Sequence, residues 1–166
     1  MPRPRASQVQ QEIKQRRPFN TPAHEAFVAL LRTADVVRQR AAAGLAASGL
    51  TPQQYNVLRI LRGAGEEGLP TLEIGERMIE RAPGVTRLLD RLEKKGLVRR
   101  RRCPEDRRQV LCWPTPRALE LLAELDRPIA DSDREAIGSL GRREIETLVA
   151  LLDRVRSGGD GDAHQP

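Results

Sequence analysis

Arginine side chains gather in the middle of the chain at spacings that could hold a polyphosphate. Arg87 and Arg91 lie four residues apart, so a helix would present both on one face. Arg107 and Arg108 follow Asp106 in a stretch rich in turn residues. Clustered cationic groups release counterions from nucleic acid when they bind it, and guanidinium groups also recognise base edges. This pattern predicts a contact with double-stranded DNA.

Composition bounds the class of protein. The chain has 166 residues, a net charge of +6, 39% hydrophobic and 31% charged residues, which is typical of one globular domain with a preference for an anionic partner. No apolar run approaches the ~20 residues that span a bilayer, and the basic N-terminus lacks the apolar core of a secretory signal. We therefore expect a cytoplasmic protein without a membrane partner.

Residues for catalysis or metal binding are sparse. Cys103 and Cys112 are the only cysteines, and His24 and His164 lie far from them in the sequence. The chain has no glycine-rich phosphate loop, nucleophile motif or paired histidine and carboxylate cluster. We expect no enzyme activity, catalytic residue, metal or cofactor. The cysteines are interpreted as small apolar strand residues, with a thiol redox switch as the alternative.

The arginines must be positioned by two helices and a turn. We expect a first helix over 72–78, capped by Thr71, that buries Leu72, Met78 and Ile79. A brief turn leads to a second helix over 83–95. Its inner stripe is formed by four apolar residues, Val85, Leu88, Leu89 and Leu92, and Gly96 ends it.

In a helix-turn-helix, the N-terminal side chains of the second helix enter the major groove. Arg87 could contact a guanine edge or a phosphate, and Thr86 a thymine methyl or a phosphate oxygen. Pro83 and Gly84 are small enough to let the helix end approach DNA closely. Arg91 lies on the same outer face.

Residues 97–113 are predicted to form a two-stranded ribbon with its tip at 104–107. Placed after a helix-turn-helix, such a hairpin is a wing. We expect Arg107 or Arg108 to enter a narrow minor groove, with Asp106 holding one guanidinium in position. For Arg99 to Arg102 the alternative is a solvated edge strand that its charge protects from aggregation.

If the ribbon closes symmetrically about its tip, Cys103 lies near Arg108 and Cys112 near Arg99. The two thiols would then be several residues apart along the ladder. An internal disulfide is therefore not expected.

The flanking segments suggest a subunit interface. We divide the chain into a basic arm (1–20), a long helix (21–49), the winged helix-turn-helix (50–115), C-terminal helices (116–156) and a disordered tail (157–166). Pro128 must kink its helix or begin a new one. The amphipathic terminal helices have few mates within the chain, which favours a homodimer, with intramolecular packing as the alternative.

Residues 50–125 resemble the MarR family of bacterial winged helix-turn-helix regulators. The similarity rests on Leu-Thr-Pro-Gln-Gln-Tyr from Leu50, Thr-Arg-Leu-Leu-Asp-Arg-Leu-Glu-Lys-Lys-Gly-Leu-Val from Thr86, and Asp106-Arg-Arg followed by Thr115-Pro. It implies a mainly α fold with a small β-wing and flanking dimerisation helices. It also implies a homodimer that binds palindromic DNA, as a repressor relieved by a small-molecule effector.

The resemblance assigns the recognition helix to 83–95 and the wing signature to Asp106 and Arg108. Pro83 replaces a residue that is often polar in the family, which puts one base contact in doubt. Family effectors sit between the dimerisation helices and the winged lobe, and Arg32, Arg38 and Tyr55 are our candidates there.

Two further points qualify the resemblance. Residues 21–49 contain no cysteine, so the family's peroxide-sensing mechanism is not supported. The alternative function is a winged-helix protein-interaction module that docks an acidic partner on its basic wing.

Overall fold

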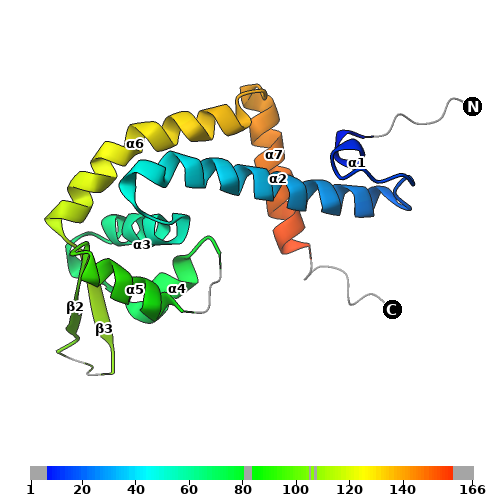
Figure 1. Ribbon diagram of the computed structural model, residues 1–166. Helices are drawn as coiled ribbons and strands as arrows, with labels where there is room; N and C mark the ends of the chain where they lie inside the picture. The colour runs from blue at the N-terminus through cyan, green and yellow to red at the C-terminus, as the bar shows by residue number, and fades with distance from the viewer. Residues whose placement is uncertain (1–6, 81–83, 105, 107, 159–166) are drawn as a thin grey trace, which may run out of the picture.

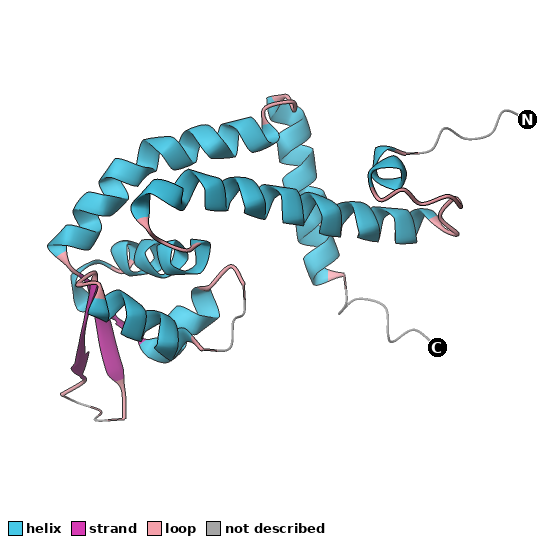
Figure 2. Cartoon of the chain, viewed as in Figure 1, coloured by secondary structure: helices cyan, strands magenta, loops and turns pink. Residues whose placement is uncertain are grey.

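The chain folds mainly into helices, with one small sheet at one end of the molecule (Figure 2), and the computed structural model describes residues 7–80, 84–104, 106 and 108–158. The elements in chain order are α1 Gln8–Glu12, α2 Pro22–Leu45, α3 Pro52–Gly63, β1 Leu69–Pro70, α4 Thr71–Arg77, α5 Val85–Lys94, β2 Val98–Arg102, β3 Val110–Pro114, α6 Pro116–Ile137 and α7 Arg142–Ser157. The expected class, mainly α with a small β-wing, is confirmed.

Three helices begin at capped Thr-Pro pairs. The hydroxyls of Thr21, Thr51 and Thr115 each accept a backbone N–H from the residue three positions on, at 3.2 to 3.3 Å. At α3 the cap is reciprocal, because the Thr51 backbone N–H donates to Gln54 Oε1 at 3.2 Å. These caps satisfy amides that would otherwise lack a partner, and they fix where the three helices begin.

Helix α3 forms the centre of the core. It lies beneath the paired helices α2 and α6 and above α4 and α5 (Figure 1). Val57, Leu58 and Leu61 of α3 are fully buried. The side chains that meet them from other elements include Ile74, Leu89, Leu92 and Leu122, also fully buried.

The first helix of the motif differs from its prediction. Thr71 is the first residue of α4 and makes no capping hydrogen bond, since Pro70 occupies the cap position. Leu72 and Ile79, which were expected to be buried, are 77% and 86% exposed. Ile74 takes the inward position instead, because only one narrow face of this 7-residue helix meets α3 and α5.

The sheet has the order β1-β3-β2 and is antiparallel throughout. Strand β1, from the loop before α4, pairs with β3 and adds a third strand to the predicted two-stranded ribbon. Cys112 pairs with Arg100, one residue away from the predicted partner Arg99. The shift arises because the ribbon closes around a longer tip than expected. Neither cysteine forms a disulfide, and Cys112 is buried.

Helix α6 continues through Pro128 to Ile137, so of the two alternatives predicted for Pro128 the start of a new segment is excluded. A proline removes one helical hydrogen bond. Leu125 and Ile129 on either side are 7% and 9% exposed, and their burial favours the unbroken helix.

Apolar side chains on the terminal helices remain uncovered within the single chain. Helix α7 has no buried residue, and Phe27 near the start of α2 is 60% exposed. The large exposed apolar residues on these helices include Leu30, Leu31, Val37, Leu119, Ile137, Leu148, Val149, Leu151 and Val155. Such contiguous faces are typical of surfaces that pack against another chain.

Candidate nucleic-acid interface

Helix α5 presents a cationic face away from the core. Leu89 and Leu92 are fully buried, whereas Thr86, Arg87 and Arg91 are exposed. The helix therefore separates an apolar inner stripe from an outer face that is open to a ligand, as predicted.

Gly84 caps the start of α5 with φ of 109°, in the left-handed region that favours glycine. This conformation turns the chain directly into the helix without a side chain at its end. The helix was predicted to begin at Pro83 but begins at Val85, because Gly84 has a non-helical, left-handed conformation; Pro83 itself lies outside the described residues.

The wing stands beside α5 at the same end of the molecule (Figure 1). Pairing of Arg102 with Val110 leaves residues 103–109 as its tip. Within the tip, the Cys103 backbone N–H donates to the Gln109 carbonyl at 3.0 Å. Arg108 is exposed there, whereas Arg107 lies outside the described residues.

Asp106 holds the turn of the wing through hydrogen bonds to the two residues Arg108 and Gln109. Its Oδ1 accepts the Arg108 backbone N–H at 3.0 Å, and its Oδ2 accepts Gln109 Nε2 at 3.1 Å. Among the described residues no ion pair joins Asp106 to the Arg108 side chain, which differs from our expectation. A short carboxylate bonds readily to the backbone two residues on, and this local geometry leaves the guanidinium of Arg108 exposed.

The four arginines of β2 do not form a uniform solvated edge. Arg99 lies over the Trp113 ring, with Cζ 4.9 Å from the ring centroid. Arg100 forms ion pairs with Asp90 and Glu93 of α5. Arg101 and Arg102 are exposed, in line with the solvated alternative. The sequence signal for the ion pairs was present, because two carboxylates three residues apart on a helix share a face.

The three candidate effector residues do not converge. Arg32 pairs with Glu12 and Asp35 at 3.5 and 3.4 Å, and Arg38 lies 3.4 Å from the Glu80 carboxylate, so both are exposed side chains of α2 that already contact acids. Tyr55 is 9% exposed and belongs to the core. Their positions favour structural and surface roles.

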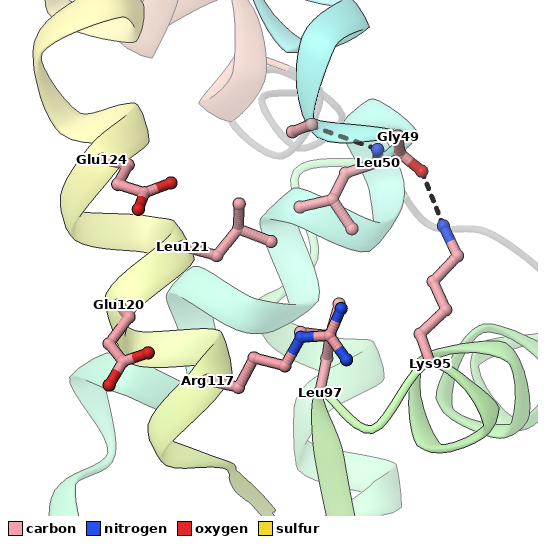
Figure 3. Close-up of a pocket in the computed structure, with 9 residues that line it drawn as sticks. Gly49, Leu50, Lys95, Leu97, Arg117, Glu120, Leu121 and Glu124 are labelled. Atoms are coloured by element: carbon pink, nitrogen blue, oxygen red, sulfur yellow. Dashed lines mark hydrogen bonds between the residues drawn. The ribbon is translucent and has the colours of Figure 1, made fainter.

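A cavity of about 480 Å³ lies instead between α6, the α2–α3 junction and the end of α5 (Figure 3). Leu50, Leu97 and Leu121 contribute apolar lining, and Arg117, Glu120 and Glu124 project from α6. Lys95 closes one side by donating from Nζ to the Gly49 carbonyl at 2.6 Å. The volume is in the range of small-molecule sites.

Other kinds of site find no support in the part of the chain that the structure describes. No three His, Cys, Asp or Glu side chains gather there as metal ligands. None of the helices there is both long and apolar enough to cross a bilayer.

A two-helix motif followed by a basic hairpin defines a winged helix-turn-helix. Residues 50–110 match the model of the MarR family. The HTH-type transcriptional regulator MhqR of Bacillus subtilis is 31% identical over 107 residues, which cover 64% of this chain and 72% of that protein. The chain belongs to the MarR family of transcriptional regulators.

Solved structures agree with this assignment. A MarR transcription factor from Planctomyces limnophilus is 38% identical, with a TM-score of 0.64 over 81% of this chain and 98% of that one. BpsR of Bordetella bronchiseptica is 25% identical, with a TM-score of 0.70 over 80% of this chain and 98% of that one. The DNA binding of BpsR is described as regulated by 6-hydroxynicotinic acid.

Proposed function

We propose that this protein is a homodimeric repressor that binds a palindromic DNA operator. The observation that carries the proposal is the juxtaposition of two exposed cationic elements, Arg87 and Arg91 on α5 and Arg108 on the wing. Helix α5 would lie in the major groove and the wing in the adjacent minor groove. Gly84 and Thr86 would approach the duplex at the helix start, and we include Pro83 and Arg107 among the proposed DNA contacts.

Dimerisation would come from the segments that flank the lobe of residues 50–115. The exposed apolar faces of α2, the C-terminal half of α6 and α7 would pack against the same faces of a second copy. Recognition helices of a dimer must match half-sites about one helical turn, ~34 Å, apart. A palindromic operator follows from this two-fold symmetry.

Effector control is the third part of the proposal. The cavity of Figure 3 is lined by helix α6, by Gly49 and Leu50 at the α2–α3 junction, and by Lys95 and Leu97 at the end of α5. A small ligand bound there would contact both helix α6 and the winged lobe, so it could change their relative orientation. The regulated DNA binding described for BpsR supports a response of this kind.

The deciding experiment is footprinting of the purified protein on genomic DNA, including the region upstream of its own gene. We expect a protected palindrome and an affinity that falls steeply with salt. Retention of an acidic protein partner with no protected DNA would support the interaction module and contradict the proposal.

A further inference from the structure

Arg100 is directed inward, unlike its neighbours on β2. It is paired with the buried Cys112 of β3, and its side chain is 22% exposed. Val98, two residues earlier on the same face of the strand, is 2% exposed. Arg100 therefore lies on the side of the wing that packs against helix α5.

Two carboxylates of α5 receive this guanidinium. Nη2 of Arg100 lies 2.6 Å from Asp90 Oδ1 and 2.5 Å from Glu93 Oε2. Nε of Arg100 also donates to Glu93 Oε2 at 3.0 Å. The planar fork of an arginine can hold two acceptors at fixed angles, whereas a lysine ammonium acts as a point charge. The pairing thus orients the strand against the helix as well as attracting it.

We propose that Arg100 is a positioning residue that sets where the wing stands relative to recognition helix α5. It would do so by holding Asp90 and Glu93, so that Arg108 and Arg87 can engage neighbouring grooves of one duplex at the same time. This inference rests on the proposed function, because it assumes that both elements bind DNA. A wing that could swing freely would lose orientational freedom on binding, at a cost in affinity.

Neutralising the two acids tests the inference, because a charge effect and a positioning effect would change DNA affinity in opposite directions. Asp90 and Glu93 are negative charges on the helix proposed to face phosphates. If they act only through their charge, their neutralisation should tighten DNA binding. If they act by holding Arg100, their neutralisation should weaken it.

The test compares the wild-type protein with the Asp90→Asn/Glu93→Gln double variant on a fluorescently labelled operator fragment, at one fixed salt concentration. We expect the double variant to bind about three- to tenfold more weakly. The control is Glu76→Gln, which neutralises an exposed acid on α4 and should bind as tightly as wild type or more so. Unchanged or tighter binding by the double variant would overturn the inference.

A second comparison separates wing position from loss of fold. The same double substitution is introduced into Arg108→Ala, where the wing has lost its proposed groove contact. In this background we expect the double substitution to reduce DNA affinity by less than about twofold, since the effects of coupled residues are not additive. A full, additive loss in this background would contradict a positioning role.

The conservative variant Arg100→Lys completes the set. It retains one cationic partner for the two acids and should lose less DNA affinity than Arg100→Met. Equal losses of affinity would contradict a role for the ion pairs in DNA binding. Failure of the proposed function is distinguishable, because the wild-type protein would then show no DNA binding that depends on Arg108.

Discussion

Arg62 at the end of α3 and Asp126 on α6 form a doubly bonded ion pair, with Nη1 to Oδ2 and Nη2 to Oδ1 both at 2.9 Å. The pair joins helix α3 of the winged lobe to helix α6. The hydrogen bond from Arg62 lowers the pKa of Asp126 below its ordinary value of 3.8, while desolvation acts in the opposite direction.

This pair predicts a pH-dependent contribution to stability. Because the folded pKa of Asp126 is lowered, its stabilisation is complete above the unfolded value and is lost as the pH falls through the folded pKa. Asp126→Asn should reduce the free energy of unfolding by about 0.5–1 kcal/mol at neutral pH, the upper range for an exposed pair. The difference should shrink below pH 3.8.

Urea unfolding of both proteins across this pH range measures the effect. Asp133→Asn changes the same kind of charge on an exposed part of α6 and serves as the control. A deficit in Asp126→Asn that did not vary with pH would show that the ion pair is not its source.

Arg87 should contribute to sequence recognition. Arg87→Ala is expected to cost about 1–3 kcal/mol on the operator and less on a scrambled duplex, because a bidentate contact to guanine distinguishes bases. Competition binding on the two duplexes measures the difference. Equal losses on both, with a salt slope smaller by about one, would assign Arg87 to a phosphate instead.

Arg108 should contribute through the minor groove. Arg108→Ala is expected to weaken binding about tenfold or more and to reduce the preference for A·T-rich flanks, where the narrow groove concentrates negative potential. The matched control is Arg127→Ala, an arginine of α6 whose side chain is 93% exposed and remote from the wing. If Arg108→Ala and Arg127→Ala lost the same DNA affinity, the loss in Arg108→Ala would come from the change in net charge alone.

The exposed face of α7 should mediate dimerisation. Val149 and Val155 are 52% and 65% exposed in the single chain. The Val149→Glu/Val155→Glu variant is expected to raise the dimer dissociation constant at least about a hundredfold, since burial of each valine contributes about 1.5 kcal/mol. Sedimentation velocity checks the mass, and far-ultraviolet circular dichroism checks that the helices persist. A wild-type monomer would contradict the dimer proposal directly.

Cys112 should resist alkylation in the native state. Burial raises the pKa of this thiol above its ordinary value of 9.0, while a hydrogen bond with Thr71 acts in the opposite direction. We expect iodoacetamide at neutral pH to modify Cys103 first and Cys112 only on unfolding, as mass spectrometry of the labelled peptides would show. Rapid labelling of Cys112 in the folded protein would reopen the redox alternative for that residue.

The local features of the fold could be predicted from the sequence. Helix starts at Thr21, Thr51 and Thr115 depend on a hydroxyl three residues before an amide, and the stop at Gly96 depends on a positive φ of 70°. The inward face of α3 follows from helical periodicity. These signals operate within one or two turns of chain, so they need no knowledge of what packs elsewhere.

Relationships across elements were decided by the tertiary structure. The exposure of Leu72 depends on which face of α4 meets the core. Which arginines of β2 point toward α5 depends on the register of β2 against β3. Periodicity cannot supply either, because a shift of one residue exchanges the two faces of a strand. The sequence by itself therefore determined the winged helix-turn-helix and its cationic groups. Only the packed chain decided that Arg100 is held by Asp90 and Glu93, whereas Arg101 and Arg102 of the same strand are exposed.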